Sequence, residues 1–225
     1  MKNIFLFVSV LSTLIGSSQP VVCKSMRTLQ KEIRKDPAQE MLELKEICPS
    51  LQYDFRYATA NNFVGKPMYP IHTRTTFMRK GPAQAIRSIQ NELASKGLGL
   101  KIWDAYRPYA VTVAFWNLIG DERYVANPVK GSGHNRGIAV DLTLIRLDNG
   151  EELPMGTGFD HFSDTAHHSY LYLPSNIIQN RTLLKTLMEK QGFKSYNEEW
   201  WHYSWPEPER FPILDIPFTK LKRKF

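Results

Sequence analysis

The chain has little cysteine, and it has no apolar run long enough to cross a membrane. Its 225 residues include two cysteines, Cys23 and Cys48, which are too few for a disulfide scaffold. In an oxidising compartment the two could form one bridge, or both could remain free thiols. Neither stands among other metal-ligating residues, so a cysteine metal site is not indicated. The sequence also contains no internal repeat or low-complexity stretch, which excludes repeat architectures.

The N-terminus carries the pattern of a secretory signal. A charged start is followed by an apolar run over 4–15, and small residues come next. A membrane span needs about 20 apolar residues, whereas a short apolar core before small residues is typical of a cleaved leader. We therefore expect a signal peptide within 1–22, export to the periplasm and no transmembrane span in the mature chain. A buried N-terminal helix and lipid attachment at Cys23 are the alternatives, the latter disfavoured by the bulky Val22 before it.

The length that remains after the leader fits one domain. Some 200 residues are enough to bury a sizeable core without a second domain. The charged segment 23–45 is predicted to be a lead-in without a well-packed helix, because its apolar residues are sparse. We expect the domain over 46–218 and a basic C-terminal tail over 219–225.

The apolar pattern of the domain predicts an α+β fold with a mainly antiparallel sheet and packed helices. Helices are indicated where apolar residues recur on one face between start and stop signals, such as a capping Ser175 and a terminating Gly192. Strands are indicated by alternating apolar residues beside turn signals. The predicted helices are 81–96, 111–118 and 175–191, and the predicted strands are 98–102, 137–147 and 196–205, with a tight turn at 148–150.

Two short motifs together hold the residue types of a catalytic zinc site. Residues 132–141 read SGHNRGIAVD, and residues 199–202 read EWWH. Such a site needs three protein ligands, an open position for water and a nearby base that does not bind the metal. His134, Asp141 and His202 supply the ligand types, and Glu199 supplies the second carboxylate. The pair of motifs therefore indicates a zinc peptidase, although a single histidine taken alone is more often structural.

The predicted strands decide whether these side chains can meet. Alternation over 137–147 places the apolar residues on a core face and Asp141 on the opposite face, as in a half-buried strand. His134 is expected in a loop made flexible by glycines, from which it can curl back towards Asp141. Residues three apart on a straight strand point to opposite faces, so Glu199 must lie at a bend or strand entrance if it shares a site with His202.

Several further motifs occur around this pattern, and together they resemble one enzyme family. Ser-x-His-x-x-Gly-x-Ala-x-Asp followed by Glu-x-Trp-His is similar to the zinc signature of the D-alanyl-D-alanine dipeptidases, the vancomycin-resistance type included, and of the related zinc D,D-carboxypeptidases. The resemblance extends over roughly residues 45–218. Its other motifs are YAT at 57–59, NFVGK at 62–66, WDAYRP at 103–108, DLTL at 141–144, PMG at 154–156, FD at 159–160 and HH at 167–168.

The resemblance implies the fold and the catalytic machinery. The fold would be that of the zinc D-Ala-D-Ala peptidases (hedgehog-like), with one Zn²⁺ per chain bound by His134, Asp141 and His202. Glu199 would be the general base and acid, and Arg107 would face the scissile carbonyl. A fixed guanidinium aimed at a developing oxyanion can contribute about 3 kcal/mol or more, and it does not lose its charge at working pH.

The resemblance also implies the substrate, the D-Ala-D-Ala dipeptide. Ser132 and Asp160 match positions that line the substrate pocket, and a carboxylate at 160 suits a free α-amine. An exported enzyme fits cell-wall peptide turnover or scavenging better than depletion of a cytoplasmic precursor. Two alternatives stay open: a periplasmic murein D,D-carboxypeptidase, favoured by export, and a non-catalytic zinc-binding domain, disfavoured by the presence of Glu199 and Arg107.

Positive charge exceeds negative charge by +7, and the run KLKRK at 220–224 contributes strongly to this excess. A basic tail can bind nucleic acid, but an exported chain is not expected to meet it. Attraction of the tail to anionic envelope surfaces and a merely solvated tail are the two interpretations, and the second is favoured.

The remaining histidines are expected to be structural, and the sequence does not indicate an oligomeric state. These remaining histidines are His72, His161, His167 and His168.

Overall fold

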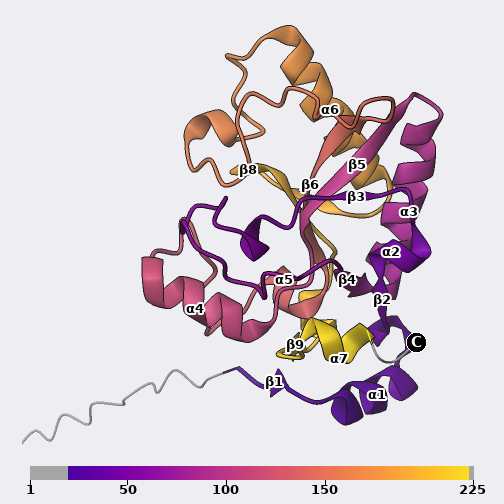
Figure 1. Ribbon diagram of the computed structural model, residues 1–225, viewed down its shortest axis with the longest axis vertical. Helices are drawn as coiled ribbons and strands as arrows, with labels where there is room; N and C mark the ends of the chain where they lie inside the picture. The colour runs from indigo at the N-terminus through magenta and orange to yellow at the C-terminus, as the bar shows by residue number, and fades with distance from the viewer. Residues whose placement is uncertain (1–19, 223–225) are drawn as a thin grey trace, which may run out of the picture.

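A computed structural model describes residues 20–222, so almost all of the predicted signal peptide over 1–22 lies outside the described residues, as do 223–225 of the predicted tail. In the described part, the centre is a five-stranded sheet in the order β3-β5-β6-β8-β7 (Figure 1). β3 runs parallel to β5, and the other neighbours are antiparallel. The predicted α+β class is confirmed. The strands are β3 (Gln52–Tyr53), β5 (Leu98–Asp104), β6 (Ala139–Arg146), β7 (Lys194–Tyr196) and β8 (Glu199–Ser204).

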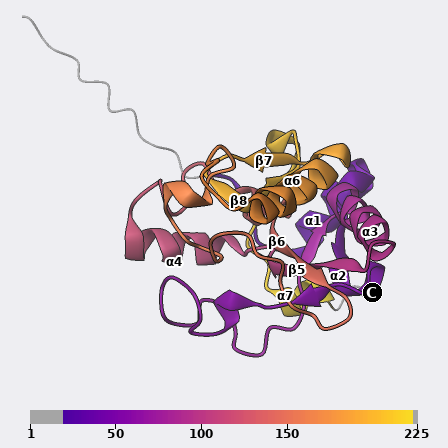
Figure 2. The same cartoon turned by 90° about the horizontal axis from the view of Figure 1, so that it is seen from above.

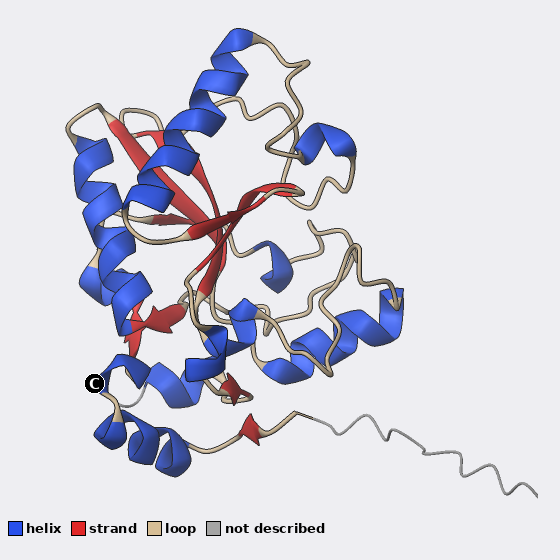
Figure 3. Ribbon diagram, turned by 180° about the vertical axis from the view of Figure 1, so that it is seen from behind, coloured by secondary structure: helices blue, strands red, loops and turns tan. Residues whose placement is uncertain are grey.

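Two long helices, α3 (Lys80–Ala94) and α6 (Ser175–Lys190), cover one face of this sheet (Figures 2 and 3). Both were expected from their apolar stripes. Ser175 is the first helical residue rather than the cap, which is Pro174 and makes no side-chain cap hydrogen bond. Burying one large aliphatic side chain here contributes about 1.5–3 kcal/mol. The first core cluster includes Ile86, Ile89 and Leu93 of α3, Leu184 and Leu187 of α6, and Leu100, Leu142 and Leu144 of the sheet.

The helices α4 (Tyr109–Ile119) and α5 (Gly133–Arg136) lie on the side of the sheet away from α3 (Figures 1 and 2). A short 3₁₀ helix at Arg56–Ala58 lies on this side too. α4 confirms the helix predicted over 111–118, with one extra residue at its C-terminal end and two at its start. The packing here is aromatic, and it forms a second core cluster. That cluster includes Tyr57, Tyr69, Phe77, Tyr106 and Phe115.

The predicted lead-in is in fact a folded part of the domain. Ser25 caps α1 (Met26–Lys35), whose Leu29 is fully buried. β2 (Met41–Glu43) then pairs antiparallel with β4 (Phe77–Arg79) and leads into α2 (Leu44–Ile47). The prediction was wrong because the partners of this segment come from distant parts of the chain, so its few apolar residues suffice.

The C-terminal end also packs more closely than the prediction of a tail suggests. β9 (Ile213–Leu214) pairs in parallel with β1 (Val22–Cys23). The described residues of the predicted tail belong to α7 (Phe218–Lys222), in which Phe218 and Leu221 are buried. The two ends of the described chain are therefore joined through one small sheet.

Strand β6 differs from its prediction in one respect. Seven of its eight residues are buried, so it is covered on both faces rather than on one. The face that carries Asp141 is covered by side chains of the pocket described below. The turn after β6 is confirmed: Gly150 has a left-handed φ of +74°, and Ile145 pairs with Glu152 across it.

The remaining features are short elements and the two thiols. Cys23 and Cys48 are buried free cysteines in different core clusters. No helix within residues 20–222 is long and apolar enough to cross a membrane. Three other 3₁₀ helices span Pro37–Gln39, Asp164–Ala166 and Pro208–Arg210.

Candidate metal centre

The three predicted ligands meet at one point between two neighbouring strands and a short helix. Asp141 of β6 lies directly opposite His202 of β8 in the antiparallel register. His202 Nδ1 is 2.9 Å from Asp141 Oδ1, and His134 Nε2 is 3.3 Å from Asp141 Oδ2 and 3.3 Å from His202 Nδ1. One ligand atom from each residue lies within 4.8 Å of the other two. The arrangement suits a single bound cation.

His134 is held by a helix rather than by a flexible loop. Ser132 caps α5: its hydroxyl accepts from the Asn135 backbone N–H at 3.2 Å, while the Asn135 side chain accepts from the Ser132 backbone N–H at 3.0 Å. Such a reciprocal capping box satisfies two helix N–H groups. Gly137 then ends the helix at φ +72°, a conformation that glycine adopts without strain.

The other ring nitrogens have partners that direct the ligand nitrogens inward. The Nδ1–H of His134 donates to the Ala105 carbonyl at 2.7 Å, and His202 Nε2 lies 3.0 Å from Ser204 Oγ. His134 Nε2 and His202 Nδ1 both face Asp141, and outer partners orient the ligand histidines of metal sites in this way. Burial alone would raise the pKa of Asp141, but the two histidines hold it well below its usual value. A carboxylate and two imidazoles of this kind fit zinc.

Glu199 stands beside the ligands without joining them. It is the first residue of β8, next to a register shift in the β7–β8 pair, which confirms the predicted position at a strand entrance. Its Oε2 lies 3.9 Å from His202 Nδ1. Burial, together with the charge of Asp141, raises the pKa of the Glu199 carboxyl above its usual value despite the opposing effect of His202.

Arg107 is fixed on the other side of the triad, directly after β5. Asp104 binds its Nε at 2.9 Å and its Nη2 at 2.8 Å, and Nη2 is 4.0 Å from Asp141 Oδ2. The guanidinium also lies over the rings of Tyr57 and Phe115, about 5 Å from each centroid. Burial alone would lower the pKa of Arg107, but Asp104 and its other neighbours raise it well above the usual value.

Asp104 is a residue of the site that sequence reasoning missed. It is 1% exposed, and besides Arg107 it accepts from the Tyr69 hydroxyl at 2.7 Å and from the Ala105 backbone N–H at 3.0 Å. The residue was part of the quoted WDAYRP motif. The signal that could have identified it was an acidic residue three positions before a candidate catalytic arginine, at the end of a buried strand.

Asp160 lies in the same pocket in a strained backbone conformation, with φ +57°. The Tyr57 hydroxyl donates to both of its carboxylate oxygens, at 3.2 and 3.0 Å. Burial, followed by the charges of Asp141 and Glu199, raises the pKa of Asp160 well above its usual value. A cation brought to this carboxylate would therefore gain a strong electrostatic interaction. Tyr57 is a second residue to which the sequence analysis gave no role.

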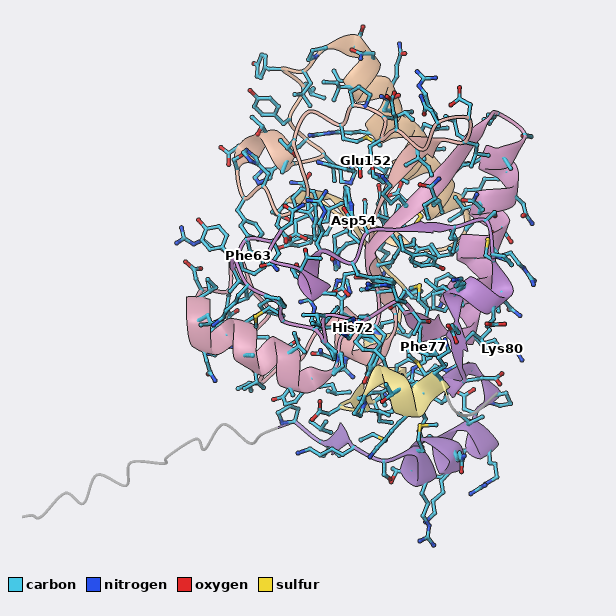
Figure 4. The ribbon with its side chains drawn as sticks, viewed as in Figure 1. Asp54, Phe63, His72, Phe77, Lys80 and Glu152 are labelled. Carbon is cyan, nitrogen blue, oxygen red and sulfur yellow. The ribbon has the colours of Figure 1, made fainter. Side chains whose placement is uncertain are left out.

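The pocket brings all seven predicted site residues together. It has a volume of about 220 Å³. Aromatic side chains form much of its wall; one of them, Phe63, lies above α4 in Figure 4. Phe63 also contacts Tyr57, Phe115 and Phe162, so the wall is continuous with the second core cluster. The predicted residues on the wall are Arg107, Ser132, His134, Asp141, Asp160, Glu199 and His202.

Three ligand side chains around one point, a carboxylate beside them and a fixed guanidinium define the class of the site, a metal-dependent hydrolase. A comparison with family models then gives the particular family. The model described as D-ala-D-ala dipeptidase, Peptidase_M15, matches residues 37–221. The chain belongs to this family, which is zinc-dependent in general. The match begins inside the segment predicted as a lead-in.

Individual relatives agree with this family over most of their length. D-alanyl-D-alanine dipeptidase of Escherichia coli K12 is 34% identical over 180 residues, which cover 80% of this chain and 92% of that protein. The enzymes of the same name from Enterococcus faecium and Enterococcus faecalis V583 are 36% and 37% identical, over 77% and 79% of this chain and 96% and 93% of theirs. A solved structure of the LdcB LD-carboxypeptidase is a distant match, with 22% identity and a TM-score of 0.37 over 59% of this chain and 61% of that one.

Proposed function

We propose that this protein is a dipeptidase that hydrolyses free D-Ala-D-Ala with one zinc ion per chain. The observation that carries the proposal is the shared pocket: the ligand triad and Asp160 line one cavity of about 220 Å³. A dipeptide has a free α-amine one residue away from its only peptide bond. A pocket with a buried carboxylate close to a hydrolytic centre suits such a substrate.

His134, Asp141 and His202 would hold the zinc ion. When bound, zinc supplies a Lewis acid that lowers the pKa of water and polarises a carbonyl. The residues fit this role because one carboxylate and two imidazole nitrogens, the ligand types that zinc takes, lie within 4.8 Å of one another. Three protein ligands also leave a position open for water, as catalytic zinc requires.

Glu199 would accept a proton from the attacking water and pass it to the leaving amine. Its carboxyl is partly buried beside the triad, and the resulting rise in pKa makes the carboxylate a stronger base. A general base works best when its pKa approaches the working pH. Its distance of 3.9 Å from a ligand nitrogen keeps it close to the centre.

Arg107 would stabilise the negative charge that develops on the carbonyl oxygen. Because Asp104 and two aromatic rings fix the guanidinium before the substrate arrives, little reorganisation is needed during the reaction. Its pKa lies above the ordinary value, so the positive charge persists at every working pH. Asp104 acts here as a positioning residue.

Asp160 would bind the free α-amine, and Ser132 would contact the substrate beside it. An ammonium group next to Asp160 offsets the repulsion from Asp141 and Glu199. The Ser132 hydroxyl accepts a hydrogen bond from the α5 backbone. Its own proton is left to donate to the substrate.

We also propose that the chain is exported to the periplasm and acts in cell-wall peptide turnover or scavenging. The support is the leader-like pattern at the N-terminus. The same location favours the second candidate function, a D,D-carboxypeptidase that trims murein stem peptides. The carboxylate of Asp160 favours the dipeptidase, because the α-nitrogen of the penultimate residue of a stem peptide is part of a peptide bond and carries no positive charge.

One experiment separates the two functions. The purified protein is incubated with D-Ala-D-Ala and with a murein pentapeptide, each with and without a chelator, and released D-alanine is measured. We expect chelator-sensitive cleavage of the dipeptide and at most slow cleavage of the pentapeptide. Cleavage of the pentapeptide alone would assign the carboxypeptidase function instead, and cleavage unaffected by the chelator would contradict metal dependence.

A further inference from the structure

A stripe of unpaired cations lies on the outer face of α1. Lys24, Arg27, Lys31 and Arg34 are all exposed: the last three lie on one side of the helix by their spacing of three and four residues, and Lys24 comes directly before the Ser25 cap. The opposite side is held in the core by Leu29. Within residues 20–222 none of these four cations forms an ion pair, whereas their neighbour Lys35 pairs with Glu32 at 2.8 Å.

Further exposed lysines lie on the helix at the other end of the chain. α1 and α7 occupy the same end of the molecule in Figures 1 and 3, and Leu29, Phe218 and Leu221 share one core cluster. α7 adds exposed Lys220 and Lys222, of which Lys222 lies 3.9 Å from the Glu43 carboxylate. Side chains tipped with nitrogen project from α1 away from the body of the molecule (Figure 4). We call this surface, made of Lys24, Arg27, Lys31, Arg34, Lys35, Lys220 and Lys222, the basic end.

The basic end accounts for most of the excess charge of the protein. Segments 24–35 and 220–222 contain seven lysines and arginines and one acidic residue, a net charge of +6, against +7 for the whole chain. Ordinary solvated surfaces mix both signs, so that a concentration of one sign marks a surface that attracts the other. Two more cations, at 223 and 224, follow in the sequence.

We propose that the basic end binds the surface of an anionic phospholipid bilayer. Juxtamembrane clusters of four to eight cations bind such surfaces through summed electrostatic attraction. The first described residues enter the fold at this end, at β1. The apolar side of α1 is already buried, so the helix rests on the bilayer instead of inserting into it.

This surface is separate from the dipeptidase site. No residue of α1 or α7 lines the pocket that holds the metal ligands. The inference therefore does not rest on the proposed function, and the two can fail independently: binding is read from vesicles, and hydrolysis is read from released D-alanine.

The test measures co-sedimentation of the full chain with vesicles. Vesicles of phosphatidylcholine with about one third phosphatidylglycerol are compared with pure phosphatidylcholine, at about 0.1 M and about 0.5 M salt. The neutral vesicles report any binding by the apolar N-terminal run. The variant carries Lys24→Gln, Arg27→Gln, Lys31→Gln and Arg34→Gln. The matched control carries Arg87→Gln, Lys96→Gln, Arg146→Gln and Lys194→Gln, four exposed cations outside the basic end with the same total charge.

We expect the wild-type chain to prefer anionic vesicles and to lose this preference at the higher salt concentration. Each cation near a bilayer changes the binding constant by about fivefold, so the α1 variant should bind on the order of several hundredfold more weakly. The control should lose far less, and both variants should keep wild-type D-Ala-D-Ala hydrolysis. Equal losses in the two variants, or no preference for anionic vesicles, would overturn the proposal. Tighter binding to soluble duplex DNA than to vesicles would overturn the choice of a lipid surface.

Discussion

The pocket and the basic end use charge in opposite ways. In the pocket, Asp104 and Arg107 are 1% and 8% exposed and are paired with each other, and each also contacts aromatic or backbone groups. On α1 and directly before it, the four cations of the stripe are exposed and have no ion-pair partner within residues 20–222. Desolvated charges that are fixed by neighbours can act strongly on a small ligand. Exposed charges act weakly one at a time and matter only as a group.

The largest effect should follow from breaking the ligand triad. His202→Ala removes one of three ligands and leaves Asp141 without its partner at 2.9 Å. We expect the variant to lose zinc on gel filtration and to lose about four orders of magnitude or more in kcat. Metal analysis of the same sample checks the cause. A variant that keeps stoichiometric zinc would contradict the ligand assignment.

The next largest effect should come from Arg107→Lys. The substitution keeps the positive charge but removes the fork that holds both contacts to Asp104. We expect kcat to fall by about 10²–10³-fold with zinc content unchanged. Steady-state kinetics with D-Ala-D-Ala provide the measurement. An unchanged kcat would mean that the fixed orientation of the guanidinium has no role in the reaction.

Asp160→Asn should have a smaller effect, and mainly on binding. The change removes the carboxylate but preserves an acceptor for the Tyr57 hydroxyl. We expect KM for D-Ala-D-Ala to rise about 30-fold with little change in kcat. A blocked substrate, N-acetyl-D-Ala-D-Ala, serves as the control because it carries no ammonium group. If the variant discriminated between the free and the blocked dipeptide as strongly as the wild type, Asp160 would not be the amine site.

The smallest expected effect is on the pH dependence of stability, and it concerns His168, whose imidazole lies in a third kind of charge environment. Its Nε2 is buried with no hydrogen-bond partner among the described residues. Burial lowers its pKa to about 4, with Lys185 and Arg181 adding to the effect and Glu189 opposing it. The folded pKa is thus below the unfolded value of about 6.5. The unfolded state then binds more protons between these values, so stability falls as pH decreases from about 6.5 to about 4.

His168→Gln should therefore reduce the acid sensitivity of the free energy of unfolding. Denaturant midpoints of the metal-free protein at pH about 7 and about 5 provide the comparison. His161→Gln, which changes an exposed histidine, is the matched control. The same decrease in midpoint for the His168 variant and the wild type would exclude a contribution from this imidazole.

The sequence predicted most of the sheet and its helices, because those elements have strong periodic patterns. Alternation predicted the strand through Asp141 and aromatic density predicted the strand through His202, and the spacing of Glu199 and His202 required Glu199 to lie at a bend or strand entrance if the two share a site. The segment before residue 46 could not be predicted in the same way. Leu29 of α1 shares a core cluster with residues of α7, β1 pairs with β9 and β2 pairs with β4, so the contacts that fold this segment come from distant parts of the chain.

The sequence predicted the residues of the candidate site more completely than the neighbouring residues that hold them in place. The ligand types and the base follow from the two motifs, but Tyr57 contacts Asp160 and Arg107 from a distant segment. Asp104 holds Arg107 from three residues before it, at a bond that residue types alone do not specify. Likewise, glycines around His134 suggested flexibility, whereas the Ser132–Asn135 capping box forms a helix there. Pairwise side-chain geometry of this kind has no periodic signature in a single sequence.

The most direct test of the central claim measures zinc content and D-Ala-D-Ala turnover in one preparation of Glu199→Gln. Glu199 lies beside the triad and is not a ligand, so the variant should retain zinc at the wild-type level. Its turnover should fall by about three orders of magnitude, because the general base is lost. Turnover at the wild-type rate would contradict the account of the site, and loss of zinc would show that Glu199 is a ligand rather than the base.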